Sequence, residues 1–110
     1  MNKYQMHDAK ILQSIYSTMC ICENLHPIRL SFGAVGKGGG KCTYTGNKPL
    51  SIKIDLTRIS MGAVYVLCHE VAHQIEILNG NATHNKAFKR TEARLVKKYS
   101  NSVEAQQLYW

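Results

Sequence analysis

The chain has 110 residues, a length that suits one domain with a single hydrophobic core. Apolar residues make up 45% and charged residues 19%, as in ordinary soluble chains, and no apolar run approaches the roughly 20 residues that span a bilayer. The first ten residues carry scattered charge, unlike a secretory signal. We therefore expect a single domain over residues 1–110 in the cytoplasm, without membrane contact. It is expected at the nucleoid if the source is a bacterium, and a phage is an alternative source.

The charge of the chain indicates which partners it could bind, and its cysteine spacing indicates whether cysteines could bind zinc. Lysine and arginine number 14 against 7 acidic residues, so the net charge is +7, which favours polyanions and most simply nucleic acid. The four cysteines form no CxxC pair, and none follows Cys68. They are expected to be free thiols rather than zinc ligands.

The first half of the chain predicts a helix followed by a small sheet. Apolar residues recur at helical spacing over residues 3–25, and Pro27 closes that helix. Residues 28–32 alternate between apolar and polar, and residues 50–56 do so strictly, as half-buried strands do. Between them, the glycine-rich stretch 33–46 holds a short polar-aromatic segment. Together these segments predict a small antiparallel sheet with a hairpin.

The glycine-rich stretch fits neither common phosphate-binding pattern. A P-loop needs Gly-Lys followed by Ser or Thr, but Cys42 follows Gly40-Lys41. The dinucleotide-binding pattern fails as well, because Lys41 stands where its last glycine would be. We expect instead a mobile loop that flanks a cleft.

The second half is expected to be helical. Residues 61–78 predict one long, mostly apolar helix with Ser60 as its N-cap, and an Asn-Gly-Asn turn stops it. Thr83 is expected to cap a helix over residues 84–99, and residues 102–109 can form a last short helix. The chain is therefore predicted to be an α+β domain in which a small antiparallel sheet packs with three to four helices.

The string His69-Glu70-Val71-Ala72-His73, at the centre of the long helix, predicts a metal site. Residues four apart lie on one face of a helix, so His69 and His73 can hold one ion. Glu70 lies beside the metal rather than on it, where it can take a proton from a water molecule. Without a metal, each of these polar groups in an apolar helix would need its own partner. Zinc is the preferred interpretation.

A third ligand is required, and two residues are candidates. His84 follows His73 by eleven positions, directly after the turn, where the chain can return over the first helix. Glu92, nineteen positions after His73, has a spacing close to that of zinc sites completed by a downstream glutamate. A carboxylate at the core edge is, however, more often a partner of a ligand. We favour His84, which completes a three-histidine site for one Zn²⁺ with an open position.

The helix after His84 has an apolar and a basic side. The apolar stripe consists of Phe88, Leu95 and Tyr99. The basic side consists of Lys86, Arg90, Arg94, Lys97 and Lys98. No acidic residue four positions away neutralises it, so contact with a phosphate backbone, of single- or double-stranded DNA, competes with the role of a solvated surface.

The combined pattern resembles a known family. A leading helix, a strand, a glycine-bearing hairpin, a second strand, HEVAH, Asn-Gly and His84-Asn85-Lys86-Ala87-Phe88 look like the SprT-like (Spartan-type) metalloprotease domain, over roughly residues 5 to 99. The family typically has glycine where Asn85 stands, and many bacterial members end in a cysteine-based zinc ribbon that has no counterpart after Cys68. The resemblance implies a zincin-like fold, zinc ligands His69, His73 and His84, and a catalytic Glu70.

The resemblance also implies a function: a zinc metalloendopeptidase that cleaves proteins on DNA, including covalently trapped ones. In this hypothesis Glu70 takes the proton of the attacking water and passes it to the leaving amine. An extended substrate pairs with an edge strand, formed by either residues 41–45 or residues 50–56. Tyr44 and Tyr65 are the candidates for stabilising the oxyanion.

Two other functions compete with this one. The first is a basic nucleic-acid-binding protein whose zinc is structural or vestigial, with Cys68 or Glu92 as a fourth ligand that closes the site. The second is a general small metallopeptidase whose activity does not depend on DNA.

Overall fold

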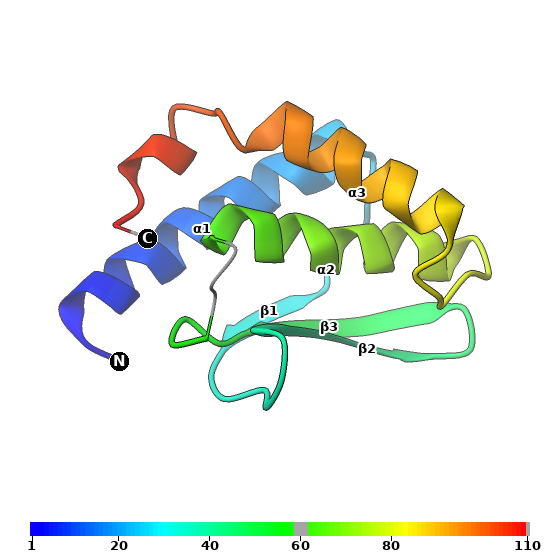
Figure 1. Ribbon diagram of the computed structural model, residues 1–110, viewed down its shortest axis with the longest axis horizontal. Helices are drawn as coiled ribbons and strands as arrows, with labels where there is room; N and C mark the ends of the chain where they lie inside the picture. Colours follow the sequence, from blue (N-terminus) through cyan, green and yellow to red (C-terminus); the bar gives the residue numbers. More distant parts are fainter. Residues whose placement is uncertain (59–61, 110) are drawn as a thin grey trace.

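The structure, a computed structural model, describes residues 1–58 and 62–109 (Figure 1). Within these ranges three α-helices combine with one three-stranded sheet, so the predicted α+β class is confirmed. The elements are α1 (Lys3–Cys22), β1 (Arg29–Phe32), β2 (Gly40–Thr45), β3 (Lys48–Ile54), α2 (Ala63–Leu78), α3 (Lys86–Tyr99) and the short 3-10 helix η1 (Ala105–Gln107). None of the helices described is long and apolar enough to cross a membrane.

The first helix begins at a capping box. The Asn2 side chain accepts a hydrogen bond from the Gln5 backbone N–H, and the Gln5 side chain accepts one from the Asn2 N–H. The helix ends at Cys22, earlier than the predicted residue 25, because Asn24 adopts a left-handed backbone conformation with φ 55°. The chain then enters β1 at Arg29, two residues after Pro27.

The strands lie in the order β1-β3-β2, with β3 in the middle. β2 pairs with β3 as an antiparallel hairpin, as predicted, but β1 pairs with β3 in parallel. The prediction of a wholly antiparallel sheet is therefore wrong. The chain reverses direction twice between β1 and β3, so the first and third strands point the same way, and the third inserts between the other two. Alternation along each strand cannot reveal this order, because it reports only which face is buried.

The inner face of the sheet packs on the helices. Ile52 and Ile54 are fully buried there, and Leu56 follows them into the core. The strict alternation predicted from residue 50 breaks at its start, because a bulge shifts the pairing between Thr43 and Tyr44 and leaves Leu50 exposed.

Helix α2 is the central element of the fold. It contacts β2 and β3 on one side and α1 and α3 on the other, so it lies between the sheet and α3 (Figure 1). This position explains why its sequence is apolar on most sides. The predicted end at residue 78 is confirmed, and the described helix begins at Ala63 after Gly62. The predicted N-cap Ser60 and the predicted first residue, 61, lie outside the described residues.

The last helix starts two residues later than predicted. Asn85, not Thr83, is the N-cap of α3, since its side chain accepts a hydrogen bond from the Phe88 N–H at 3.1 Å. His84 consequently lies in the turn before the helix rather than in its first turn. The short helix predicted over residues 102–109 is reduced to a single 3-10 turn, η1.

Candidate metal centre

Three histidines from two segments converge beside α2. His69 and His73 are one turn apart on α2, and His84 comes from the turn between α2 and α3. One ring nitrogen from each lies within 4.8 Å of the others, and Nε2 of His73 is 2.9 Å from Nε2 of His84. His69, His73 and His84 could together hold a metal ion. The preference for His84 over Glu92 agrees with this arrangement.

The donor set fits zinc. Tetrahedral coordination with Zn–N distances of about 2.0–2.1 Å separates two ligand nitrogens by roughly 3.3–3.4 Å. The separations here, 2.9 Å for one pair and no more than 4.8 Å for any, bracket that value. Burial and the charges of His69 and His84 lower the pKa of His73 to about 4, which keeps its imidazole neutral as ligation requires. The three imidazoles are therefore close enough together to hold one metal ion.

Glu92 contributes to the centre as a partner of a ligand. Its carboxylate, on α3, is hydrogen-bonded to Nδ1 of His69. A carboxylate can only accept, so Nδ1 carries the proton and Nε2 keeps its lone pair free for a metal. A carboxylate that fixes the tautomer and orientation of a ligating histidine recurs in metal sites. The structure therefore places Glu92 as the hydrogen-bond partner of a candidate ligand, the alternative role that the sequence also allowed.

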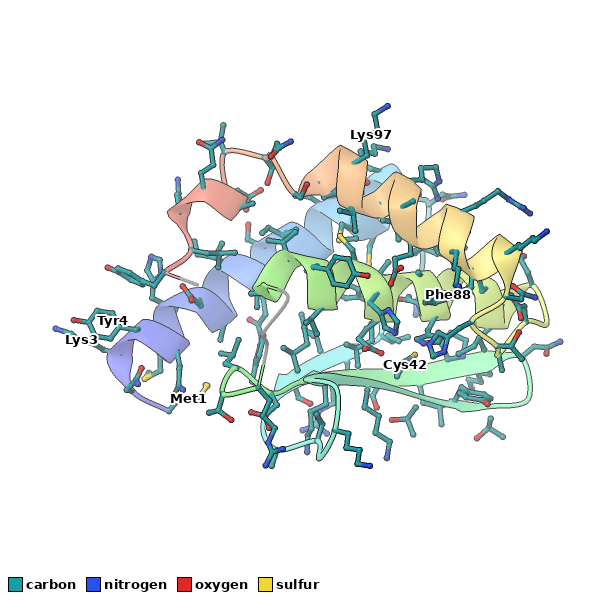
Figure 2. All side chains as sticks on the ribbon, in the orientation of Figure 1. Met1, Lys3, Tyr4, Cys42, Phe88 and Lys97 are labelled. Carbon is teal, nitrogen blue, oxygen red and sulfur yellow. The ribbon has the colours of Figure 1, made fainter. Side chains whose placement is uncertain are left out.

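The ring of Phe88 on α3 packs against all three imidazoles. Its ring is buried, and its centroid lies 5.0, 4.4 and 4.8 Å from those of His69, His73 and His84. Figure 2 shows Phe88 pointing from α3 toward α2. Contacts of this kind restrict the rotamers of the ligands before any ion binds. The sequence placed Phe88 in an apolar stripe and in the motif that follows His84, but it did not predict the contact of Phe88 with the histidines.

The turn that presents His84 is braced by a network of hydrogen bonds. The Asn81 amide donates to Glu76 at 3.1 Å and to Asn85 at 2.8 Å, while its carbonyl oxygen accepts from the N–H and the hydroxyl of Thr83. Glu76 is buried on α2 and Asn85 caps α3, so Asn81 ties the turn to both helices. Asn81 was predicted only to stop a helix.

Glu70 is buried next to the three histidines. Only 4% of it is exposed, and burial, together with the charge of Glu92, raises the pKa of its carboxyl to about 7. The close approach of β2 depends on Gly40, since a Cβ there would stand 2.7 Å from Oε2 of Glu70 and 2.8 Å from Cγ1 of Val66. A side chain at this position of the strand would collide with the carboxylate.

An open cleft runs past Glu70 along β2. One part, of about 310 Å³, is lined by Gly38, Gly40, Tyr65, Val66, His69 and Glu70. The other part, of about 280 Å³, is lined by Gly40, Lys41, Cys42, Tyr44, His69, Glu70, His73, Ile77, Ala82 and His84. The two parts share Gly40, His69 and Glu70, so both oxyanion candidates, Tyr65 and Tyr44, lie along the cleft but on different sides of Glu70. The glycine-rich stretch thus flanks a cleft, as predicted.

The strand order decides between the two predicted docking edges. β3 is paired on both sides, so residues 50–56 offer no free edge, and that alternative is wrong. β2 is an outer strand of the sheet and its residues line the cleft. Residues 41–45 therefore remain as the edge to which an extended chain could add.

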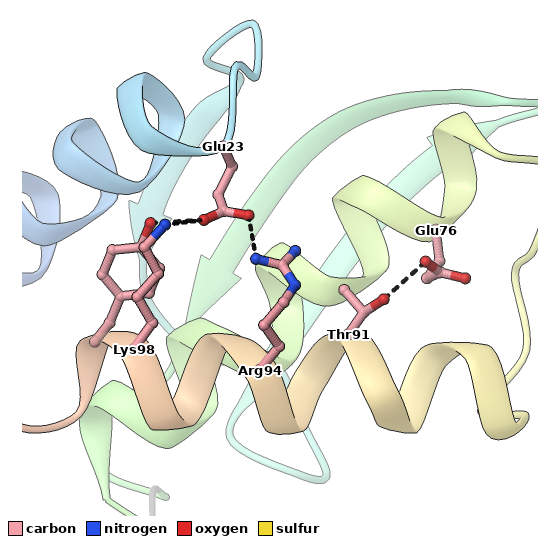
Figure 3. A network of polar contacts seen from close by, with 6 residues as sticks. Glu23, Glu76, Thr91, Arg94 and Lys98 are labelled. Carbon is pink, nitrogen blue, oxygen red and sulfur yellow. Dashed lines mark hydrogen bonds and ion pairs between the residues drawn. The ribbon is translucent and has the colours of Figure 1, made fainter.

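The basic side of α3 is partly neutralised by a distant acidic residue. Glu23, at the end of α1, accepts from Arg94 at 2.6 Å, Lys98 at 3.1 Å and the Tyr99 hydroxyl at 2.8 Å (Figure 3). These bonds lower the pKa of Glu23 despite its burial. The absence of an acid four positions away did not exclude a partner from another helix. Arg94 and Lys98 are therefore tied down, whereas Lys86, Arg90 and Lys97 have no ion pair within the described part of the chain.

The cysteines take no part in the centre. All four are free, as predicted, and Cys68 is fully buried. Figure 2 shows Cys42 on the helix side of the sheet, where burial and the charge of Glu70 raise the pKa of its thiol to about 12. Among the described residues the group that could hold a metal ion consists of three histidines, with no cysteine or carboxylate as a fourth member.

Several residues of the site could not be recognised from the sequence. Gly40 acts through its approach to α2, whereas Phe88 and Asn81 act through contacts that their local signals, the apolar stripe and the Asn-Gly-Asn turn, did not reveal. Comparisons of the chain with protein-family models, curated proteins and solved structures find no match.

Proposed function

We propose that this chain is a zinc-dependent metalloendopeptidase with a zincin-like fold, in which His69, His73 and His84 hold one Zn²⁺ and Glu70 is the catalytic base. The observation that carries the proposal is the pairing of a three-histidine group with a buried glutamate of raised pKa in an open cleft. Perturbed acids next to metal ligands in a cleft are typical of catalytic sites.

The metal would supply Lewis acidity. Zinc held by three protein ligands lowers the pKa of water toward about 7 and polarises a carbonyl group. Three histidines with no fourth protein donor among the described residues suit such a role, because a structural zinc usually has four protein ligands. Zinc therefore fits the residues present, and its identity is part of the proposal.

Glu70 would move the proton. A carboxyl with a pKa of about 7 is poised to accept a proton from water near neutral pH and to return it to a leaving amine. Its side chain lines both parts of the cleft, so water and substrate can reach it although it is largely buried. His69 would be held in its ligating tautomer by Glu92 throughout.

The substrate would be an extended segment of a protein that adds to the free edge of β2. Residues of β2 line the cleft beside the histidines, and main-chain pairing binds segments with little regard to side chains. The exposed Tyr44 lies on one side of Glu70 and Tyr65 on the other, within reach of the two halves of a bound chain.

We further propose that the natural substrates are proteins on DNA. The net charge of +7 and the unpaired cations of α3 support a polyanionic partner, and they would bring the cleft to DNA-bound proteins. Location in the cytoplasm, with access to DNA, belongs to the same proposal.

The competing function is a nucleic-acid-binding protein with a structural or vestigial zinc. Two observations disfavour it. Cys68, one candidate fourth ligand, is buried, and Glu92, the other candidate, is hydrogen-bonded to His69. The experiment is to incubate the zinc-loaded chain with a basic DNA-bound protein, with and without DNA. Cleavage only with DNA supports the proposal, cleavage without DNA dependence favours a general metallopeptidase, and no cleavage at full zinc occupancy favours the competing function.

A further inference from the structure

The outer face of the sheet carries a second basic surface. Helices of the described chain lie on one side of the sheet only (Figure 1), and side chains with nitrogen ends project from the other side (Figure 2). Successive strand residues alternate between faces, so the neighbours of the buried Ile52 and Ile54 point outward. Six residues of this surface line one depression of about 350 Å³, and we call them the sheet face: Arg29, Ser31, Lys41, Thr43, Ser51 and Lys53.

The charge of this face is not offset in the sequence. Residues 24–54 contain no aspartate or glutamate but five cations, namely Arg29, Lys37, Lys41, Lys48 and Lys53. Elsewhere, Asp8, Asp55, Glu70 and Glu76 are buried, so more than half of the seven acidic residues add little to the surface. Three of the five cations, Arg29, Lys41 and Lys53, belong to the sheet face, which contains no acidic residue.

Two lysines of the sheet face repel one another directly. Lys41 on β2 and Lys53 on β3 are cross-strand partners and both are exposed. Like charges at such positions destabilise a sheet, whereas an anion bound between them would remove the repulsion. On α3, by contrast, the carboxylate of Glu23 neutralises Arg94 and Lys98. No carboxylate of the described residues does the same for Lys41 and Lys53.

The remaining residues of the sheet face suit phosphate rather than bases or lipid. Ser31, Thr43 and Ser51 offer hydroxyl donors between the cations, and Thr43 and Ser51 lie 3.0 Å apart. Hydroxyls and cations of this kind contact phosphate oxygens. The face has no aromatic side chain for stacking on single-stranded bases, and no large apolar side chain for insertion into a membrane.

We propose that the sheet face binds the phosphate backbone of double-stranded DNA without reading its base sequence. The surface is separate from α3, since Lys97 points away on the opposite side of the molecule (Figure 2), and it shares Lys41 with the cleft beside the histidines. The proposal shares DNA as a partner with the proposed function but does not depend on hydrolysis. It gives the chain two basic surfaces, so one molecule could bridge two duplex segments or hold one while the cleft engages a protein.

The test compares two double variants of equal charge in the zinc-loaded full chain. Arg29→Gln/Lys53→Gln removes two cations of the sheet face, and Lys3→Gln/Lys10→Gln removes two exposed cations of α1. Each lowers the net charge from +7 by two, to +5. Binding to a dye-labelled duplex is measured by fluorescence anisotropy over a range of salt concentrations.

The sheet-face variant should bind the duplex at least about tenfold more weakly. Its slope of log Kd against log salt should fall by about 1.8, because each phosphate that the protein no longer neutralises lowers the slope by about 0.9. The α1 variant should keep the slope of the wild type. Equal effects of the two variants, or no duplex binding by the wild type, would overturn the proposal. Tighter binding to a single strand or to anionic-lipid vesicles would overturn the choice of duplex DNA.

Failure of this proposal can be told apart from failure of the proposed function. The sheet-face variant should hydrolyse a short peptide at the wild-type rate, because neither residue lines the cleft. The Glu70→Gln variant should bind duplex DNA like the wild type although it is expected to lose hydrolysis. Loss of duplex binding in Glu70→Gln would overturn the separation of the two sites.

Discussion

Glu92 and His69 are joined across two helices by a hydrogen bond between the carboxylate and Nδ1 of the imidazole. The bond fixes the tautomer of His69, so that Nε2 keeps the lone pair that a metal ion would need. Replacing Glu92 with Ala should therefore weaken metal binding by about tenfold to a hundredfold, as the loss of such partners generally does. Competition with a chromogenic chelator measures this affinity.

The matched control for that change is Glu23→Ala. It also removes a carboxylate that bonds α3, but far from the histidines, so it should lower the midpoint of thermal unfolding without altering metal affinity. A complete loss of metal in Glu92→Ala, equal to that in His84→Ala, would instead identify Glu92 as a ligand. Unchanged affinity would contradict the positioning role.

Gly40 should be needed for catalysis but not for metal binding. Gly40→Ala would place a Cβ 2.7 Å from Oε2 of Glu70 and so displace the carboxylate. A displacement of about 1 Å can lower a rate by about a hundredfold. Peptide hydrolysis is compared at equal zinc content with Gly33→Ala, whose added Cβ would only make ordinary contact with Lys53 at 3.7 Å. Equal rates in the two variants would show that β2 does not constrain Glu70.

The pH dependence of stability in the metal-free chain should reveal the burial of Glu70. Its folded-state pKa of about 7 lies above its ordinary value of 4.5, so the folded state favours the protonated carboxyl. The contribution of the protonated Glu70 carboxyl to the free energy of unfolding is fully present below pH 4.5 and is lost as the pH rises through 7. Glu70→Gln should consequently stabilise the metal-free chain by roughly 3 kcal/mol at pH 8.5 and by little at pH 4.5. Urea unfolding at both pH values measures the difference, and a gain that is the same at both would contradict it.

The N-cap of α3 should couple stability to metal affinity. The Asn85 oxygen accepts from the Phe88 N–H and from the Asn81 amide, which braces the turn that carries His84. Asn85→Ala should cost about 1 kcal/mol of unfolding free energy and also weaken metal binding. Asn2→Ala removes the equivalent cap of α1, so it should reduce stability alone. Equal metal affinity in both variants would separate the cap from the centre.

Local patterns in the sequence predicted a good part of this structure. The apolar helical pattern around HEVAH predicted a core helix, which is buried on most sides, and alternation in residues 50–56 predicted β3, which buries one face. The convergence of His84 on His69 and His73 followed from the turn between them. What escaped prediction depends on contacts between distant segments: the parallel pairing of β1, the approach of Gly40 to Glu70 and the bonds of Glu23 to α3.

The N-cap of α3 shows that sequence patterns can also fail to predict local structure. Thr83 and Asn85 are both good N-cap residues, and they are two positions apart. In the structure the Asn81 side-chain oxygen accepts both donors of Thr83, and the Asn85 side chain caps the helix. The shift moves His84 out of the helix and into the turn, where it can reach His73.

The most direct test of the account is the rate of peptide hydrolysis by wild type and Glu70→Gln at matched zinc content, in the presence of duplex DNA. Gln cannot accept the proton, but it preserves the shape of the side chain and leaves His69, His73 and His84 untouched. We expect both proteins to bind one zinc per chain and the variant to lose at least about a hundredfold in rate. Hydrolysis by Glu70→Gln at the wild-type rate, or none by the zinc-loaded wild type, would contradict the account.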